Sequence, residues 1–351
     1  MTQLYYIKQL ALLSDRHFKA NDFINTIKVV GAISLKNMSI SVILPTANFS
    51  SGIQRLLSAI KSQTAELLEI IVIDSSSNGD SADIARALGV KVVVIPAEEF
   101  NHGGTRSLGA KIAHGDVLIF LTQDVVLADS TAFEKIASVF VDSQVGAAYG
   151  RQLPHEDADI FGRVLRAFNY SGSSYVRVLK DREKYGIKTA FLSNSFAAYS
   201  RKALESIGWF KDGLILGEDT YAGAKLLMSG YRVAYAADSI VRHSHNYTPW
   251  QDFSRYFDIG VFHTREEWII TTFGKAEGEG LKFLLSSVKF FKDNRALIKV
   301  PEFFLRAALK FIGYRLGRWY SLLPLKLCER LSMNSAWWNP NIATPKYRCQ
   351  K

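Results

Sequence analysis

Four short apolar segments of the chain are each followed by polar residues of types that can bind a charged or phosphorylated ligand. In chain order these residues are Pro45, Thr46 and Asn48; Asp74; His102, Gly103, Gly104 and Arg106; and Thr122, Gln123 and Asp124. Taken singly, an Asp after a strand is more often a helix cap, and paired glycines are more often a turn. Four such features at four successive segment ends favour one shared site, where glycines let a backbone approach a phosphate.

The apolar segments themselves predict buried parallel strands. They are rich in Val and Ile and do not alternate with polar residues, as expected for strands covered on both faces. The predicted strands are 40–44, 70–73, 90–95 and 117–121, and the helical patterns between them are 52–62, 81–88 and 104–113. This alternation predicts an α/β fold with a mostly parallel, Rossmann-like sheet. Ligands bind beyond the carboxyl ends of such strands, where the polar residues lie.

Two later groups of residues could also do chemistry. Glu218 and Asp219 open a helical pattern at 220–229, where acidic residues are ordinary because they stabilise the helix N-terminus. His243 and His245 follow a strand pattern at 231–236, and their ordinary role would be as partly exposed loop residues. Side chains at i and i+2 after a strand point the same way, so the two imidazoles can act on one ligand.

Composition and cysteine content narrow the class of protein. The chain has 351 residues, 48% hydrophobic and 22% charged, which is typical of a folded globular protein. Its two cysteines, Cys328 and Cys349, are too few for a disulfide framework or a cysteine zinc site, which favours a reducing compartment. We find no signal-peptide pattern and no uncharged apolar run long enough to cross a bilayer.

The net charge of +10 is concentrated near the C-terminus. Residues 281–330 contain eleven Lys or Arg against three Asp or Glu, a net charge of +8. A basic region of this kind predicts either nucleic acid or an anionic membrane surface as partner. The many large aliphatic and aromatic side chains among these charges favour the membrane, so we expect no nucleic-acid partner.

The pattern of segments predicts three regions. Residues 1–38 are a helical lead-in that is either accessory structure or an over-extended start, residues 39–275 form the α/β domain, and residues 276–351 form a helical region. Within that last region, one narrow helix face carries Glu302, Arg306, Lys310, Gly313 and Gly317, and the rest of the helix is mainly apolar. We expect the wide apolar face either to pack against the α/β domain or to insert shallowly into a membrane.

Several of these motifs together resemble one enzyme family. The segments Val42-Ile43-Leu44-Pro45-Thr46-Ala47-Asn48 and Ile71-Val72-Ile73-Asp74-Ser75-Ser76-Ser77 are similar to the start of family-2 glycosyltransferases of the GT-A fold. The segments 100–106 and 120–124 resemble the bacterial rhamnosyltransferase branch, which uses dTDP-L-rhamnose to build O-antigens and other surface polysaccharides. The resemblance continues through 149–154, 217–219, 242–245, 256–263 and 313–317, and covers about residues 39–340.

The sequence departs from the family at the metal motif, Asp-x-Asp. Thr122 stands at its first position, so Asp124 is the only carboxylate there, although Thr-Gln-Asp is itself common in the rhamnosyltransferase branch. Transfer from a nucleoside diphosphate requires the leaving diphosphate to be neutralised, which a divalent cation such as Mg²⁺ or Mn²⁺ can do. We expect Asp124 to be its carboxylate ligand, with His243 and His245 as further ligands.

The resemblance also implies roles for the other residues. The family uses the second acid of the Glu218-Asp219 pair as the base that deprotonates the acceptor, with inversion at the sugar. Thymine binding falls to Asp74, with Pro45, Thr46 and Asn48 lining the pocket. Expected contacts with the rest of the donor fall to His102, Gly103, Gly104, Arg106, Thr122 and Gln123, with Asn194 and Arg201 as further candidates for the diphosphate or acceptor.

The predicted function is therefore transfer of L-rhamnose from dTDP-β-L-rhamnose to a saccharide, with a lipid-linked acceptor favoured, to form an α-L-rhamnoside. We expect the protein to be cytoplasmic and peripheral on the inner face of the cell membrane. Three alternatives stay open: the same fold with a UDP-galactofuranose or UDP-hexose donor, a nucleotidyltransferase, and a non-catalytic membrane-tethered sugar- or nucleotide-binding module. The nucleotidyltransferase is disfavoured because 45–51 is not a glycine-rich basic loop.

Overall fold

The computed structural model describes residues 38–75, 80–274 and 279–339. The chain divides into two compact units, 1–38 and 39–351, and the described helices and strands belong to the second. The predicted helical lead-in at 1–37, Ser76, Ser77 and Cys349 lie outside the described residues.

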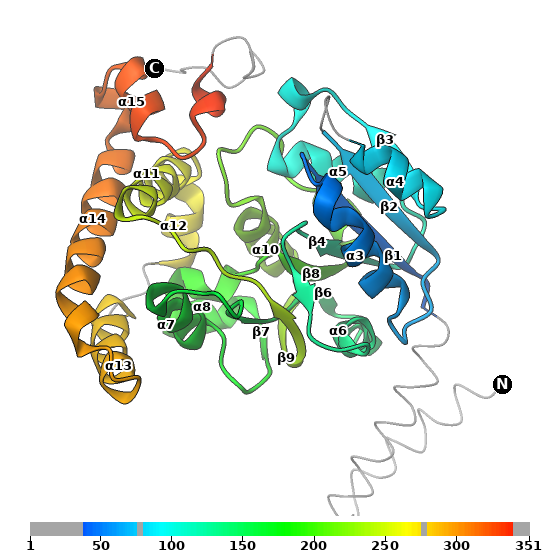
Figure 1. Cartoon of the computed structure of the whole chain (residues 1–351), viewed down its shortest axis with the longest axis horizontal. Coiled ribbons are helices and arrows are strands. Elements are labelled where there is room, and N and C mark those ends of the chain that lie inside the picture. Colours follow the sequence, from blue (N-terminus) through cyan, green and yellow to red (C-terminus); the bar gives the residue numbers. More distant parts are fainter. Residues whose placement is uncertain (1–37, 76–79, 275–278, 340–351) are drawn as a thin grey trace, which may run out of the picture. The chain divides into compact units, whose positions relative to one another are not determined.

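The first half of the second unit is built from the predicted βαβ units (Figure 1). The strands β1, β2, β3 and β4 pair in parallel in the order β3-β2-β1-β4. The elements of this half are β1 Ile40–Thr46, α3 Ser50–Lys61, β2 Glu69–Asp74, α4 Ser81–Ala87, β3 Lys91–Val94, α5 His102–Ile112 and β4 Val117–Leu121. The strands β1, β2 and β4 therefore end at or directly before the polar residues, as predicted, whereas His102 opens α5 further along the chain from β3.

Burial follows the sequence pattern for three of these strands. Every residue of β1 and β4 is buried, as are the last four of β2, because helices cover both faces of the sheet there. The strand β3 differs, since Lys91 and Val94 are exposed. The prediction that this strand is covered on both faces is wrong, because β3 forms the edge of the sheet.

The second half of the sheet mixes strand directions. Beyond β4 the order continues β8-β6-β9-β5, with β7 paired to β9, and both β8 and β5 run antiparallel to their neighbours. The strand predicted at 231–236 is longer than expected and continues to Arg242, directly before His243. The elements are β5 Val126–Leu127, α6 Ala132–Ser138, β6 Val145–Leu153, α7 Ile160–Asn169, β7 Tyr175–Arg177, α8 Arg182–Tyr185, β8 Phe196–Ser200, α9 Arg201–Ser206, α10 Glu218–Met228 and β9 Arg232–Arg242.

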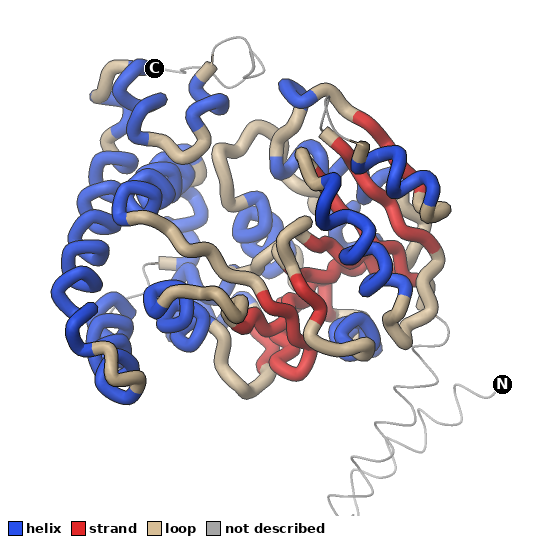
Figure 2. Tube along the Cα trace, in the orientation of Figure 1, coloured by secondary structure: helices blue, strands red, loops and turns tan. Residues whose placement is uncertain are grey.

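The C-terminal part of the described chain is helical (Figure 2). It comprises α11 Pro249–Arg265, α12 Glu267–Phe273, α13 Glu279–Asp293, α14 Val300–Arg318 and α15 Leu325–Leu331. The side chains of Phe253, Phe257 and Val261 on α11 belong to the same hydrophobic core as the sheet. None of the helices in the described ranges is both long enough and apolar enough to cross a membrane.

The narrow polar face of α14 lies inward. Gly313 and Gly317 lie so close to α11 that a Cβ on either would overlap the carbonyl oxygen of Phe253 or Phe257. Arg306 is buried and forms an ion pair with Asp252 of α11 at 3.1 Å. Only part of the wide apolar face packs inward: Phe303 joins a buried cluster with Val164 of α7. Phe304, Leu305, Phe311 and Ile312 are exposed.

Candidate active site at the carboxyl ends of the strands

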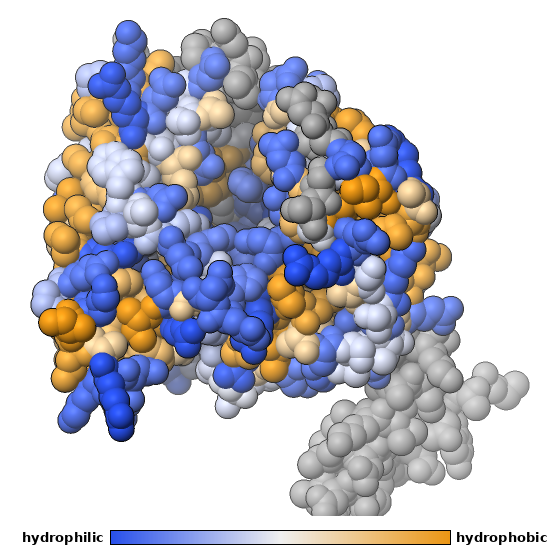
Figure 3. All heavy atoms as spheres, in the orientation of Figure 1, coloured by the Kyte–Doolittle hydropathy of each residue, from blue (hydrophilic) through white to orange (hydrophobic). Residues whose placement is uncertain are grey.

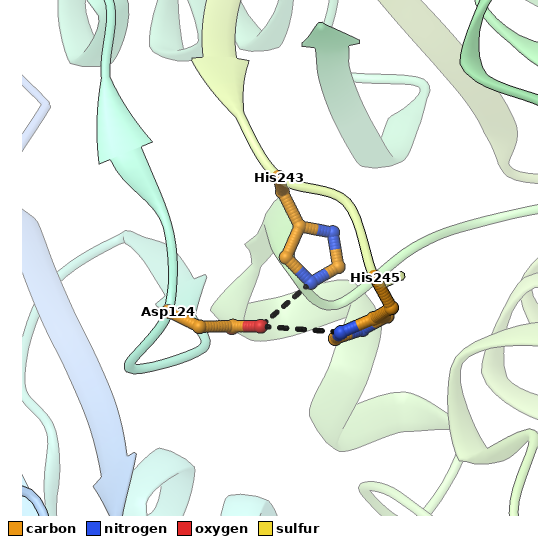
Figure 4. Close-up of side chains that lie close together, drawn as sticks. All are labelled: Asp124, His243 and His245. Carbon is orange, nitrogen blue, oxygen red and sulfur yellow. Dashed lines mark ion pairs between the residues drawn. The ribbon is translucent and has the colours of Figure 1, made fainter. Parts of the chain in front are cut away.

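The first cluster of the site is assembled by the register of two strands. In the antiparallel pair β5–β9, Val126 lies opposite Arg242. The residues just before Val126 therefore meet those just after Arg242, which brings Asp124 to His243 and His245. The Oδ2 atom of Asp124 lies 3.2 Å from Nε2 of His243 and 3.8 Å from Nδ1 of His245. Figure 4 shows the three side chains pointing toward one another from these two turns.

The hydrogen bonds of His243 leave its Nε2 atom facing the carboxylate. Nδ1 of His243 lies 2.9 Å from Oε1 of Gln152, an amide oxygen that can only accept, and 3.4 Å from Nη2 of Arg166, which can only donate. The shorter contact favours a hydrogen on Nδ1. The Nε2 lone pair of the neutral ring and the Asp124 oxygen then point into the same space, as in metal sites where the second ring nitrogen is held by a protein acceptor.

The protonation states favour this arrangement. Burial lowers the pKa of His243 below its usual range, although Asp124 opposes the shift. Burial, followed by the neighbouring His243, lowers the pKa of His245 to about 4. Both imidazoles are therefore neutral near pH 7. The side chains of Asp124 and His245 are 40% and 39% exposed, so solvent can reach them. One carboxylate and two neutral imidazoles, with ligand atoms within 4.8 Å of one another, form a donor set that fits a divalent cation.

The second cluster lies at the start of α10. Asp219 is partly exposed, and its carboxylate accepts hydrogen bonds from the backbone N–H groups of Thr220 at 2.7 Å and Asn194 at 3.3 Å. Its neighbour Glu218 is buried, accepts from Nδ2 of Asn194 at 3.0 Å and forms an ion pair with Arg106 at 3.1 Å. The two acids of the pair therefore differ in environment, one open and one enclosed.

Burial, and then the negative charge of Glu218, raises the pKa of Asp219 to about 7. A carboxyl group in this range can accept a proton near neutral pH more readily than an ordinary aspartate, because general bases work best with a pKa near the operating pH. Asp219 is thus suited to deprotonate a hydroxyl group.

A short segment before β8 joins the two clusters. The backbone and side chain of Asn194 hold Asp219 and Glu218, and the hydroxyl of Ser195 lies 3.5 Å from Nε2 of His243. The preceding Ser193 accepts a hydrogen bond from Gln152, the residue that orients His243. The segment 193–195 therefore contacts both the predicted base and one of the predicted cation ligands.

The residues predicted to bind the nucleotide lie at the ends of β1, β2 and β4. The fully buried Asp74 accepts hydrogen bonds from the hydroxyls of Thr46 at 2.8 Å and Ser81 at 2.9 Å. The Gln123 side chain bonds both the N–H and the carbonyl of Ala47. Pro45 and Thr46 end β1, Asn48 follows with a left-handed φ of 50°, and Thr122 opens the turn that carries Asp124. The contacts of these residues with a nucleotide stay a prediction.

The start of α5 differs from expectation. The helix begins at His102 rather than at 104, and the N–H of Gly104 donates to the capping side chain of Asn101 at 2.6 Å. Gly103 packs against the backbone, since a Cβ there would overlap the carbonyl oxygen of Lys211. The sequence placed the amides of both glycines and the Arg106 side chain at a diphosphate. In the structure the N–H of Gly104 bonds Asn101, and the Arg106 side chain pairs with Glu218.

Two residues near the site were not predicted from the sequence as functional candidates. Gln152 orients His243, and Arg166 of α7 donates from Nε to the carbonyl oxygen of His243 at 2.6 Å. Gln152 lies in the 149–154 motif, which was a usable signal. No local pattern marks Arg166, because its partner lies 77 residues away.

Comparisons with known proteins bear on this site. The model of glycosyl transferase family 2 matches residues 41–208. The O-antigen chain rhamnosyltransferase RfbN of Salmonella typhimurium is 46% identical over 304 residues, covering 86% of this chain and 96% of RfbN. The chain belongs to glycosyl transferase family 2. A second family-2 relative, the O-antigen chain rhamnosyltransferase WbaN of Salmonella anatum, is 43% identical over 303 residues, 86% of this chain and 96% of WbaN.

Solved structures agree with this family-2 assignment at the level of the fold. The mannosyltransferase PcManGT from Pyrobaculum calidifontis, in complex with GDP-Man and Mn²⁺, has a TM-score of 0.51 and 15% identity, covering 91% of this chain and 95% of PcManGT. Residues 1–349 of TarS from S. aureus, in complex with UDP-GlcNAc, have a TM-score of 0.50 and 16% identity, covering 84% of each chain. The predictions of an α/β GT-A fold and of a glycosyltransferase resembling rhamnosyltransferases are confirmed.

Proposed function

We propose that this family-2 glycosyltransferase moves L-rhamnose from dTDP-β-L-rhamnose to a saccharide acceptor in the assembly of an O-antigen or related surface polysaccharide. The observation that carries this proposal is the joining of Asp219, a partly exposed carboxylate with a pKa of about 7, to a cation-binding cluster through Asn194 and Ser195. The choice of rhamnose is supported by the names of the two Salmonella relatives.

In this proposal Asp219 accepts the proton of the acceptor hydroxyl as its oxygen attacks the anomeric carbon. Attack opposite the leaving dTDP inverts the anomeric centre, so a β-L-rhamnosyl donor yields an α-L-rhamnoside. Asp124, His243 and His245 would hold Mg²⁺ or Mn²⁺ on the side of the leaving group. Such an ion, when bound, neutralises charge on the diphosphate.

The strand-end residues would hold the nucleoside part of the donor. Thr46 and Asp74 are joined by a hydrogen bond of 2.8 Å, and Gln123 fastens the backbone of Ala47. These contacts tie Thr46 and Ala47 to the ends of β2 and β4, which supports the proposal that Pro45, Thr46 and Asn48 line a pocket for thymine and ribose. We propose that Asp74 contributes to base recognition.

The donor is tested with a panel of dTDP-rhamnose, UDP-hexoses, UDP-galactofuranose and GDP-sugars, following release of the nucleoside diphosphate with a saccharide acceptor. We expect turnover with dTDP-rhamnose and tighter binding of dTDP than of UDP or GDP by calorimetry. Turnover with a UDP-sugar alone would assign another donor to the same site. Absence of turnover together with binding of several nucleotides would favour a binding module.

We also propose that the C-terminal helices attach the protein to an anionic membrane on its cytoplasmic side. The exposed apolar residues of α14 recur at helical spacing on one face, and Phe311 and Leu305 are 66% and 56% exposed. Figure 3 shows apolar residues along the edge of the molecule that α14 forms. The apolar face comprises Leu281 and Leu285 of α13, Leu297, Ile298, Phe304, Leu305, Phe311, Ile312, Trp319, Leu322 and Leu325.

Exposed basic residues accompany this apolar face. They are Lys282, Lys289, Lys292, Arg295, Lys299, Arg315, Lys326 and Arg330. Each basic residue near an anionic lipid surface contributes about 1 kcal/mol, and long cationic side chains reach the headgroups from an inserted helix. A lipid-linked saccharide acceptor would lie in the same membrane, so attachment would place the enzyme close to its acceptor.

Membrane attachment is tested by co-sedimentation with liposomes of phosphatidylglycerol and of phosphatidylcholine. We expect binding to the anionic liposomes, weakened by high salt and by Leu305→Glu with Phe311→Glu. Leu68→Glu is the matched control, because Leu68 is 55% exposed and lies before β2. Equal binding of both variants, or no binding of the unmodified protein at low salt, would contradict the proposal. Point variants are preferable to truncation at 280, which would uncover α11.

A further inference from the structure

We propose that Arg106 is a positioning residue for Asp219 that acts through Glu218 and does not bind the donor diphosphate. This inference rests on the proposed function of Asp219 as the base. It differs from the role that the strand-end position of Arg106 suggests, and it follows from the contacts of three buried side chains.

The guanidinium group of Arg106 is enclosed. Its side chain is 4% exposed, and Nη1 lies 3.1 Å from Oε1 of Glu218, whose side chain is 8% exposed. The same Nη1 donates to the carbonyl oxygen of His102 at 3.1 Å. The Nε atom is also buried, with no hydrogen-bond partner among the described residues, so it does not point to an open site. These contacts direct the charge of Arg106 to Glu218.

Glu218 is linked to Asp219 through hydrogen bonds to Asn194 as well as through the backbone. Asn194 donates from Nδ2 to Glu218 and from its backbone N–H to Asp219, so one residue bonds both carboxylates. The Oδ1 atom of Asn194 accepts from the Tyr199 hydroxyl at 2.7 Å, which fixes the direction of the amide. The result is a continuous chain of contacts from Arg106 through Glu218 and Asn194 to Asp219.

The charge of Arg106 has a specific effect on this pair of acids. Two neighbouring carboxyl groups in a largely enclosed place tend to share a proton, because two negative charges close together repel each other. Arg106 compensates the charge of Glu218, which leaves Asp219 as the acid that titrates. The groups facing Asp219 are Glu218 and Arg106, with Tyr170 at the end of α7 and Tyr199 of β8, whose own pKa values are raised by burial. His102 contacts Arg106 from the start of α5.

The two roles of Arg106 predict different behaviour of three variants. Arg106→Gln leaves Glu218 as an uncompensated buried charge, Glu218→Gln removes the charge that acts on Asp219, and the double variant replaces the ion pair with two neutral amides. Breaking one side of a buried ion pair is more damaging than replacing both partners. We therefore expect Arg106→Gln to lower kcat about 100-fold and the double variant to recover at least about tenfold of that loss.

The pH profile of kcat/KM provides a readout that a purely structural role would not move. We expect its acid limb to shift upward by about one pH unit in Arg106→Gln, because the two acids then share a proton, and downward by about one unit in Glu218→Gln. Arg106→Lys keeps the charge and should lie near the unmodified enzyme. Calorimetric affinity for dTDP should stay within about twofold in all variants, since none of these groups contacts the donor.

If Arg106→Gln lost affinity for dTDP, and the double variant with Glu218→Gln did not regain it, the inference would be overturned. Arg106 would then be assigned to the diphosphate. The inference would also be overturned if the acid limb of the kcat/KM profile did not shift in Glu218→Gln. This test can be made even if Arg106→Gln alone does not fold. Failure of the proposed function looks different: Asp219→Asn would then keep its activity, whatever the Arg106 and Glu218 variants do.

Discussion

The proposed active site contains two clusters that are built in opposite ways. One is the proposed cation cluster of Asp124, His243 and His245, and the other is the acid cluster of Arg106, Glu218 and Asp219. The cation cluster brings its ligand atoms within 4.8 Å of one another, and the side chains of Asp124 and His245 are about two-fifths exposed. The acid cluster neutralises its charges internally and exposes only Asp219 to any extent. A cation site needs ligand atoms that an ion can reach. A general base needs neighbouring charges that stay fixed, because those charges set its pKa.

The origin of each cluster differs as well. The cation cluster follows from backbone register, because β5 and β9 pair and bring two turns together. The acid cluster follows from side-chain packing, because α5, α10 and the segment before β8 must meet for Arg106, Glu218 and Asn194 to bond. Substitutions should therefore affect ligand binding in the first cluster and proton transfer in the second.

Removal of the cation is the largest expected effect and acts on the first cluster alone. EDTA should abolish transfer, and Mg²⁺ or Mn²⁺ should restore it, because an uncompensated diphosphate is a poor leaving group. Asp124→Ala should be inactive at any metal concentration. The control is Asp238→Asn, which changes an exposed aspartate of β9 and should keep its activity. Activity is followed by dTDP release. Full activity after chelation would contradict the proposal that the first cluster binds a cation needed for transfer.

Asp219→Asn tests the second cluster without disturbing the first. We expect kcat to fall by about 10²–10⁴-fold, the usual contribution of a general base. The variant should keep its fold and its affinity for dTDP, measured by thermal unfolding and calorimetry. An Asp219→Asn enzyme with near-normal turnover would show that the acceptor proton goes elsewhere.

The pH dependence sharpens the comparison further. Asp219 must be deprotonated to act, and burial with the Glu218 charge raises its pKa to about 7. The value of kcat/KM should therefore rise with pH up to about 7 and fall about tenfold per unit below it. A limb near pH 4, where an ordinary aspartate titrates, would show that Asp219 is not perturbed in this way.

The smallest expected effect lies outside both clusters, at the contact of α14 with α11. Gly317→Ala should lower the free energy of unfolding by about 1–3 kcal/mol, because its Cβ would overlap the Phe257 carbonyl. Gly280→Ala is the matched control, since a Cβ there meets nothing within 4 Å. Chemical denaturation measures both. Equal stability of the two variants would mean that α14 is not closely packed.

Much of the placement of the candidate residues was predictable because parallel strands place their carboxyl ends together. The Val- and Ile-rich segments marked β1, β2 and β4, and the residues after them led to Asp124 and Thr46. The spacing of His243 and His245 indicated that both rings face one ligand, which the 4.8 Å cluster is consistent with. Local sequence predicts such features because they depend on strand periodicity and on the residue types directly after each strand.

The partner of Arg106 was not predictable in this way. Its charge is matched by Glu218, more than a hundred residues later, and the contact requires α5 and α10 to pack beside each other. Gln152 and Arg166 depend equally on their distance to His243 in space. No periodicity encodes a pair formed across so many residues.

By itself the sequence determined the family, the parallel half of the sheet and the residues at its strand ends, because these depend on short-range pattern. Only the tertiary structure decided which charges are enclosed and which are open. On α14 it turned the narrow face of Arg306, Gly313 and Gly317 inward, since glycine allows close approach and Asp252 compensates the arginine. The side chains of Phe304, Leu305, Phe311 and Ile312 on the same helix were thereby left exposed, a consequence of packing that a helical wheel cannot show.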